Sequence, residues 1–276
     1  MKKIICTIAA LLCAFGLSAQ EFKMDWHRVH MEGSRTGVTA PDAENVKEAL
    51  GEVRDGVYYA PNGKVFKKGS VVKAAELLIA AQPEMAYVKE VICYSPKEVL
   101  RSTRPQNELS NLIVDRMMIK TAEETGKKVD VGIINFGGIR VDLPQGNVLL
   151  DDILSMLPFE NYICYVQLKG SDLRNLYKQF AQTGMQVVGG VELTIKDKEL
   201  VDVKVGGKPL DDKALYGLAT IDFLLDGGDD VFCGRNAVDL VLTKTLLRDA
   251  LLPYLRELGA QGIPVEYHVD NRVVEL

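Results

Sequence analysis

The sequence VDVGIINFGGIR, Val129–Arg140, carries the strongest structural signal in the chain. Its first half, Val129–Asn135, is apolar and β-branched, which predicts a buried strand that Gly137 and Gly138 terminate. The turn places Asn135 before the paired glycines and Arg140 after them. Glycines let the backbone approach a ligand closely, and a guanidinium can grip phosphate or carboxylate oxygens. The turn is therefore a candidate binding loop, and a tight turn with a surface arginine is the simpler alternative.

The segments on either side of this stretch alternate between strand and helix patterns. The expected strands are Val88–Cys93, Ile163–Leu168, Val191–Ile195, Leu200–Val205, Tyr216–Ile221 and Val265–Val274. Two long helices are expected at Leu109–Thr125 and Lys244–Leu258. A short helix that ends near Leu157 is expected to be capped by Asp151 and Asp152, and a helix at Leu173–Gln182 is expected to be capped by Ser171 and Asp172. Interleaved helices and hairpins predict an α/β (α+β) fold with mixed sheets and flanking helices.

The region before this alternation is polar and rich in turns, so residues 21–85 are assigned to an N-terminal arm of unknown role. Within it, Gly56–Gly69 reads as a hairpin around Pro61-Asn62-Gly63, and Val72–Ala81 as a short helix.

A second glycine turn, Phe223–Asp230, places an aromatic ring before Gly227 and Gly228 and a carboxylate, Asp229, after them. A third element, Leu157–Asn161, offers Phe159 at the end of a helix. Two aromatic rings on separate loops can sandwich a flat ligand ring, and each stacking face contributes about 1 to 3 kcal/mol for a nucleobase. Packing of either ring in the core is the alternative.

These elements, in this order, resemble the C-terminal domain of the 5'-nucleotidase and UDP-sugar hydrolase family. The family pattern N-x-G-G-I-R, then L-P-F, then F-x-x-x-G-G-D is matched at residues 135–140, 157–159 and 223–229. Three connectors also look like those of the family: Leu168-Lys169-Gly170, Val188–Val191 and Val205–Leu210. The resemblance runs from about Tyr87 to the C-terminus, and residues 86–276 are assigned to this domain.

The resemblance implies a role for each matched residue. Phe159 and Phe223 would stack on the two faces of a base, and Asp229 would accept the ribose hydroxyls. Asn135 and Arg140 would hold ribose, base edge or phosphate, next to the backbone of Gly137, Gly138, Gly227 and Gly228.

Two departures from the family pattern change what is expected locally. The family often has Glu and Gly where this chain has Gln106 and Ser110. Arg104, a candidate phosphate ligand, is therefore out of register by about one position and receives no role. Asp230 stands where a glycine is common.

The hydrolytic half of the family is a separate metallophosphatase domain that binds two metals, and its motifs are not found here. After the first twenty residues only His27, His30 and His268 remain, with no G-N-H-[DE] motif. Asp25-Trp26-His27 spells D-x-H, but a two-metal site needs several more ligands. The acids Asp222, Asp226, Asp229 and Asp230 fit no standard calcium loop. The expectation is a chain without catalytic residues, metal ligands or a cofactor, whose partner chain carries two divalent metals.

The first twenty residues predict a secretory signal peptide, because Lys2 and Lys3 precede an uncharged apolar run, Ile4–Leu17. Its removal leaves 31 basic against 38 acidic residues, and the full chain already has a net charge of −5. Duplex nucleic acid and anionic membranes are therefore not expected as partners. The mature chain keeps Cys93, Cys164 and Cys233, so at most one pair can form, and Cys164 reads as a small buried hydrophobe.

Together these features predict a periplasmic or secreted nucleotide-recognition domain, the substrate-binding half of a split 5'-nucleotidase. Three alternatives stay open: weak hydrolase activity of this chain alone, a nucleotide sensing or scavenging module without a catalytic partner, and a structural domain that binds no nucleoside.

Overall fold

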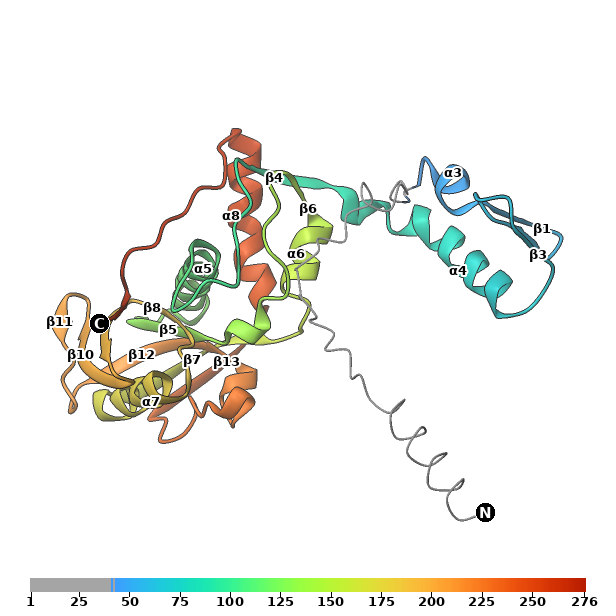
Figure 1. The fold of residues 1–276 in the computed structure, drawn as a ribbon. Coiled ribbons are helices and arrows are strands. Elements are labelled where there is room, and N and C mark those ends of the chain that lie inside the picture. Colours follow the sequence, from blue (N-terminus) through green and yellow to red (C-terminus); the bar gives the residue numbers. More distant parts are fainter. Residues whose placement is uncertain (1–40, 42) are drawn as a thin grey trace, which may run out of the picture. The chain divides into compact units, whose positions relative to one another are not determined.

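The computed structural model describes residue 41 and residues 43–276 (Figure 1). The expected signal peptide and the Asp25-Trp26-His27 motif lie outside the described residues. The chain divides into two compact units between Ile79 and Ala80. Each unit is described by itself.

The first unit contains a small antiparallel sheet in the order β1-β2-β3. Its elements are α3 (Val46–Leu50), β1 (Glu52–Arg54), β2 (Val57–Tyr59), β3 (Val65–Phe66) and the first part of α4 (Ser70–Glu84). The hairpin expected around Asn62 is present, with Tyr58 paired with Phe66 and their rings stacked at 5.9 Å. The expected helix Val72–Ala81 is also present, and α4 extends beyond it at both ends.

The second unit is built on a five-stranded sheet in the order β13-β7-β12-β5-β8. The strands are β5 (Val131–Ile134), β7 (Tyr162–Lys169), β8 (Val187–Gly189), β12 (Leu215–Ile221) and β13 (Asp239–Leu246). Strand β12 is parallel to β5, and the other neighbouring pairs are antiparallel. The expected mixed sheet is confirmed.

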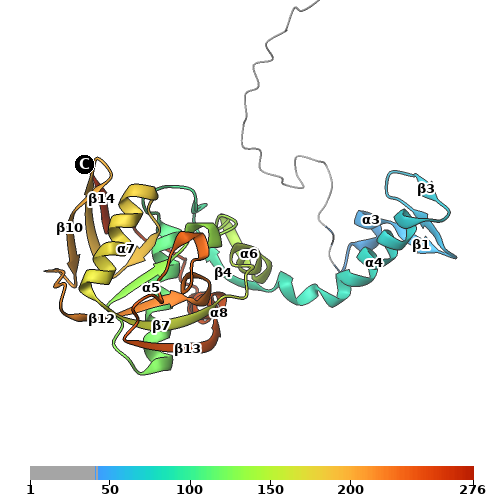
Figure 2. The ribbon, with the colours of Figure 1, turned by 90° about the horizontal axis from the view of Figure 1, so that it is seen from below.

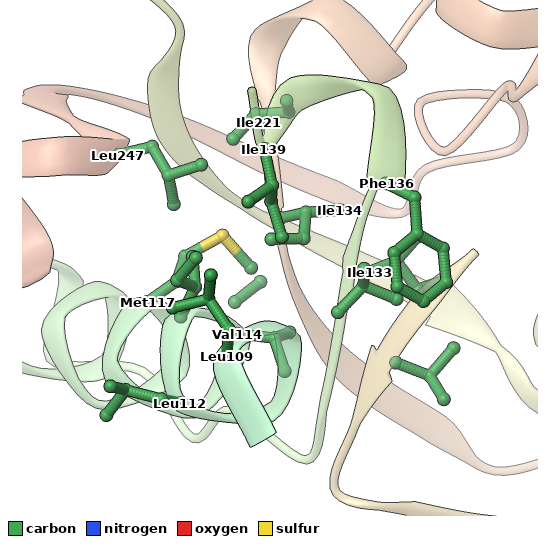
Figure 3. Close-up of a cluster of buried hydrophobic side chains, with 14 of the residues drawn as sticks. Leu109, Leu112, Val114, Met117, Ile133, Ile134, Phe136, Ile139, Ile221 and Leu247 are labelled. Atoms are coloured by element: carbon green, nitrogen blue, oxygen red, sulfur yellow. The ribbon is translucent and has the colours of Figure 1, made fainter. Parts of the chain in front are cut away.

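Helix α5 (Glu108–Thr125) fills the core against this sheet. It begins at Asn107, whose side chain accepts from the Ser110 backbone N–H at 2.8 Å while the Ser110 hydroxyl accepts from the Asn107 N–H. This reciprocal capping box satisfies two N–H groups that a helix start leaves free. The helix ends at Gly126, whose φ is 65°, a conformation that favours glycine. Figure 3 shows its apolar face, including Leu109 and Met117, against the β5 segment.

The remaining elements of this unit surround that core. Helix α8 (Leu247–Gln261) lies with α5 on one face of the sheet, and α7 (Gly170–Thr183) lies on the other (Figure 1). A second sheet, in the order β11-β10-β9-β14, contains β9 (Val191–Lys196), β10 (Glu199–Val205), β11 (Lys208–Pro209) and β14 (Val273–Glu275). The others are η1 (Ala86–Lys89), β4 (Val91–Ser95), η2 (Phe136–Gly138), β6 (Gly146–Leu149), α6 (Leu150–Met156), η3 (Asp222–Leu224) and η4 (Gly228–Asp230), with β4 paired to β6.

The last part of the chain is held by side-chain bonds instead of a long strand. The buried Arg272 guanidinium donates to both oxygens of Asp115 on α5 at 2.9 Å and to Asp270 at 2.7 and 2.8 Å. Tyr267 donates to Asp115 at 2.6 Å. The expected strand Val265–Val274 is therefore wrong in extent, because only Val273–Glu275 pairs with β9.

Several other expected elements need correction. Residues 239–246 form strand β13, which was not expected, and α8 begins at Leu247 instead of Lys244. The first of the expected strands is β4, which begins at Val91 instead of Val88 because Ala86–Lys89 is a 3-10 turn. The expected acidic caps are also wrong: Lys169 occupies the N-cap of α7, and Leu149 that of α6, where Asp152 accepts from the Leu149 N–H at 2.7 Å.

Candidate functional site

The topology brings three loops together at one end of the strands of the five-stranded sheet. Strands β5 and β12 are parallel neighbours, so the loops that follow them both leave at the carboxyl ends of these strands. Strand β7 is antiparallel to β12, so the loop that precedes β7 lies at that end of the sheet as well. These loops carry the N-x-G-G-I-R, F-x-x-x-G-G-D and L-P-F motifs.

The three loops enclose a pocket of about 220 Å³. Seven residues line it: Asn135, Gly137, Arg140, Phe159, Asn161, Phe223 and Asp229. The set contains all five non-glycine residues to which the family resemblance assigns a role: Asn135, Arg140, Phe159, Phe223 and Asp229. Of the four candidate glycines, Gly137 lines the pocket, and Gly138, Gly227 and Gly228 are not among the lining residues.

Asn135 and Asp229 join the first loop to the glycine loop. The Asn135 Nδ2 donates to Asp229 Oδ2 at 2.7 Å, and the Asn135 residue is only 6% exposed. Its Oδ1 is buried and finds no hydrogen-bond partner among the described residues. A Cβ at position 138 would lie 2.9 Å from this Oδ1, so Gly138 provides the space that the Asn135 side chain needs.

Arg140 closes the first loop on itself and reaches toward an aromatic ring. Its Nη1 donates to the Gly137 carbonyl at 3.0 Å, and its guanidinium carbon is 5.8 Å from the centre of the Phe159 ring. Arg140 is exposed, so the remaining guanidinium N–H groups face solvent at the pocket.

The glycine loop has a backbone that few residues tolerate. Gly227 has φ of 100°, and a Cβ at Gly228 would collide with the carbonyl oxygen of Phe223 and lie 2.7 Å from its ring. Asp229 and Asp230 also have positive φ, 50° and 59°. The loop is therefore folded tightly beneath Phe223, and this arrangement sets the position of the Asp229 carboxylate.

The two aromatic side chains are not core residues. Phe159 is 47% exposed and Phe223 is 45% exposed, and both line the pocket. Asp222 connects their loops, because its Oδ1 accepts from the Phe223 N–H at 2.8 Å and from the Tyr162 N–H at 3.2 Å. The alternative of core packing is wrong for both rings.

Asn161 lines the pocket and received no role from the sequence. Its carbonyl accepts from the Leu247 N–H at 3.0 Å, which fixes the loop to the start of α8. The available signal was its place two residues after Phe159, in the same short loop.

Arg104 lies outside this pocket. Its guanidinium carbon is 3.6 Å from the centre of the Phe136 ring, and its Nη1 donates to the Arg101 carbonyl at 2.9 Å. Burial, together with the nearby charge of Arg101, lowers the pKa of Arg104. Arg104 thus packs on the ring of Phe136, the residue that follows Asn135.

Within the described part of the chain, no group of three or more His, Cys, Asp or Glu residues could hold a metal ion. Cys93, Cys164 and Cys233 are free and buried. Burial raises the pKa of Cys93 to about 11 and that of Cys233 to about 12, so these thiols are poor nucleophiles at neutral pH. Among residues 41 and 43–276, no helix has the length and apolar character to cross a bilayer.

The sequence of this chain is similar to one known protein family and to several known proteins. The family model described as 5'-nucleotidase, C-terminal domain, matches residues 88–233. Protein UshA from Yersinia enterocolitica is 30% identical over 129 residues, which are 45% of this chain and 22% of that protein. Cell wall protein Lmo0130 from Listeria monocytogenes is 28% identical over 213 residues, 68% of this chain and 27% of the relative.

Solved structures show the same fold. The 5'-nucleotidase precursor from Thermus thermophilus matches with a TM-score of 0.65 at 24% identity, over 80% of this chain and 48% of that one. The NAD nucleotidase NadN from Haemophilus influenzae matches with a TM-score of 0.56 at 20% identity, over 79% and 47%. The matched region thus spans about half of these two chains and less than a third of the two sequence relatives.

Proposed function

The chain belongs to the 5'-nucleotidase C-terminal domain family, and on this basis we propose that residues 86–276 recognise a nucleotide for a split, exported 5'-nucleotidase. In this proposal the metallophosphatase half is a separate chain, and this chain binds substrate without hydrolysing it. The observation that supports the proposal most is the convergence of two half-exposed phenylalanines and the Asn135–Asp229 pair on one pocket.

The base would lie between Phe159 and Phe223. Both rings line a pocket too small for a drug-sized ligand but suited to one flat ring system, and stacking is worth about 1 to 3 kcal/mol per base. Asn161, in the same loop as Phe159, offers an amide donor and acceptor for the edge of the base. Stacking accepts every base, so base preference would depend on this amide.

The ribose would lie over Asp229. Its Oδ2 is held by Asn135, and no described residue donates to its Oδ1. A carboxylate fixed in this way can accept both sugar hydroxyls, and charge-assisted hydrogen bonds are stronger than neutral ones. Arg140 would hold a phosphate or the sugar with its exposed N–H groups.

The hydrolytic step would belong to the partner. The described residues do not fit the family's two-metal centre, because no His, Cys, Asp and Glu side chains gather into a possible metal site. Two divalent metals bound by a metallophosphatase chain would activate water and stabilise the charge on the phosphoryl group. This chain would contribute binding and orientation, which bring the phosphate to that centre.

Turnover by the purified protein, residues 21–276, tests whether hydrolysis requires the separate metallophosphatase chain. Incubated with AMP or a UDP-sugar and manganese or zinc, it is expected to release no phosphate above a blank prepared from the Phe159→Ala/Phe223→Ala variant. Metal-dependent release that this variant lacks would show that the chain hydrolyses by itself. Nucleotide binding without any metallophosphatase encoded in the same genome would favour a sensing or scavenging module instead.

A further inference from the structure

A second cavity lies between α7 and the segment that follows the glycine loop. Its volume is about 170 Å³. Figure 2 shows α7 beside the loop after β12, which is drawn in orange. Two buried leucines form part of the wall, and six residues carry its polar and aromatic groups: Asp172, Asn175, Gln179, Phe232, Arg235 and Asn236. None of these lines the pocket that holds Phe159 and Phe223, so the two cavities are separate.

Arg235 supplies the positive charge of this cavity. Its guanidinium carbon lies 4.2 Å from the centre of the Phe232 ring. Among residues 41 and 43–276, the guanidinium forms no ion pair and donates no hydrogen bond. A guanidinium is planar and carries five N–H donors, so one that is stacked on a ring still offers N–H groups along its edge. Arg235 is therefore positioned by the ring and available to an acidic ligand.

Asp172 supplies the negative charge. It lies in the first turn of α7, and its Oδ1 accepts from the Asn236 Nδ2 at 2.9 Å. No described residue donates to its Oδ2, and Asp172 does not pair with Arg235 although both line the same cavity. Two opposite charges thus line one small cavity without neutralising each other. A molecule between them that carries both charges would pair with each.

The neutral side chains of the wall leave mainly oxygen acceptors. The Gln179 Nε2 donates to the Asp230 carbonyl at 2.7 Å, which leaves its Oε1. The Asn236 Nδ2 is used by Asp172, which leaves its Oδ1. Asn175 has no side-chain hydrogen bond to any described residue. An ammonium group has three N–H donors and no acceptor, so it suits a wall of carboxylate and amide oxygens.

Other classes of ligand fit this wall less well. A simple anion would meet the Asp172 carboxylate, and a simple cation would meet Arg235, so each would have a like charge nearby. A sugar ring commonly stacks on a free aromatic face, but Arg235 covers the Phe232 ring. That ring also packs against Gly227, where a Cβ would lie 2.8 Å from it. The cavity is smaller than the roughly 300 Å³ at which pockets begin to take drug-sized ligands, which favours a compact molecule.

We propose that this cavity binds a compact zwitterion of the amino-acid class, with its carboxylate on Arg235 and its ammonium group on Asp172. A carboxylate matches the N–H fork of a guanidinium, and the bond from an ammonium group to a carboxylate is charge-assisted as well. The inference goes beyond nucleotide recognition and does not rest on it, because the two cavities share no lining residue.

The test is an NMR titration of isotope-labelled protein, residues 21–276, with L-glutamine as the probe. Saturable shifts are expected at backbone N–H groups of the cavity, among them those of Asn175 and Asn236. Two analogues separate the charges of the probe: glutaramic acid lacks the ammonium group, and γ-aminobutyramide lacks the carboxylate. Each is expected to bind at least about tenfold more weakly than L-glutamine, because one charge-assisted pair is lost. Free glycine, the smallest zwitterion of the class, is titrated as well, so that a side-chain clash cannot explain a failure.

Substitutions of the two charged residues assign the two ends of the ligand. Arg235→Gln is expected to remove the residual binding of glutaramic acid and to spare that of γ-aminobutyramide. Asp172→Asn is expected to do the reverse, and both variants should bind L-glutamine at least about tenfold more weakly than the wild type. Lys178→Gln removes an exposed charge of α7 outside the cavity and is expected to bind like the wild type. Thermal unfolding checks that the variants fold.

The absence of saturable shifts with both zwitterions, or shifts confined to residues outside the cavity, would overturn the proposal. Equal affinity for L-glutamine and its two analogues would overturn it as well, since neither charge would then be recognised. Binding of glucose at the same backbone groups, with no binding of either zwitterion, would assign the cavity to polyols instead.

Discussion

The Asn135 amide donates to the Asp229 carboxylate across 94 residues of sequence, at 2.7 Å. This bond connects the loop after β5 to the loop after β12, and both residues line the pocket. The acid is on a strained backbone, with φ of 50°, and the amide is buried. Asn135 is therefore expected to act on nucleotide binding partly through Asp229.

Removal of either partner of this bond is expected to weaken AMP binding. Asn135→Ala releases the carboxylate, and Asp229→Ala removes it, so the two effects should not add. A double-mutant cycle by calorimetry should give a coupling of about 0.5 to 3 kcal/mol. Strict additivity would mean that the two residues act independently on the ligand.

Truncation of either aromatic ring is expected to weaken nucleoside binding by about 1 to 3 kcal/mol without loss of the fold. Phe159→Ala and Phe223→Ala each remove one stacking face, and both rings are half exposed, so thermal unfolding should shift little. Tyr94→Ala, a half-exposed aromatic residue on β4, serves as the control. Unchanged affinity in both Phe variants, measured by calorimetry, would place the base elsewhere.

Asp230→Gly is expected to stabilise the second unit by about 1 kcal/mol. Asp230 has φ of 59°, and left-handed backbone costs roughly 1 to 2 kcal/mol for most residues other than glycine. Its carbonyl bond from Gln179, at 2.7 Å, does not depend on the side chain. Urea unfolding measures the change, and Asp226→Gly, in the same loop without positive φ, should destabilise instead.

The hydrogen bonds from Arg272 to Asp115 and Asp270 are expected to stabilise the fold at neutral pH. This contribution to the free energy of unfolding is expected to be lost in acid. Hydrogen bonds from the guanidinium hold the pKa of Asp270 below its ordinary value, and burial opposes part of that shift. A carboxyl with a lowered folded pKa stabilises the fold above its unfolded pKa of about 4, and this contribution is lost as the pH falls through the folded pKa. Asp270→Asn should therefore lower stability at neutral pH, with a difference from wild type that shrinks in acid.

Urea unfolding from neutral pH down to about pH 2 measures this dependence. The Arg272→Met variant is the matched background, and it should itself lose about 1 to 3 kcal/mol because it removes the hydrogen bonds from the guanidinium to the Asp115 and Asp270 carboxylates. In that background Asp270→Asn should no longer alter the pH dependence. A difference that stays constant with pH would assign the effect of Asp270 to packing.

The sequence was informative where the local pattern and the fold agree. The helix at α5 could be predicted because Asn107, Ser110 and Gly126 mark its ends. Five of the six non-glycine pocket residues could be predicted because each follows a strand or helix end in a motif of fixed spacing: Asn135, Arg140, Phe159, Phe223 and Asp229. Asn161 was missed because no periodic or compositional signal separates a pocket-facing amide from an ordinary loop residue.

The errors occurred where tertiary contacts replace local signals. The residues of β13, DLVLTKTL, do not alternate strictly between apolar and polar. Lys244–Leu246 could equally begin the following helix, and only pairing with β7 resolves the choice. Residues 265–272 have a strand-like composition and instead form a segment held by Tyr267, Asp270 and Arg272. The acids near the start of α6 lie inside the helix, because Asp152 bonds back to the Leu149 N–H.

The central claim is tested most directly by calorimetric titration of AMP and its 2'-deoxy analogue into two proteins of residues 21–276, the wild type and Asp229→Ala. Loss of the 2'-hydroxyl should cost the wild type about 1 to 3 kcal/mol, because a desolvated carboxylate oxygen is left unpaired. Asp229→Ala should bind AMP more weakly and lose most of this preference, and Asp229→Asn, which tolerates positive φ, controls for the loop conformation. Wild-type protein that binds AMP with no ribose preference, or a 2'-hydroxyl penalty that is equal in wild type and Asp229→Ala, would contradict the account.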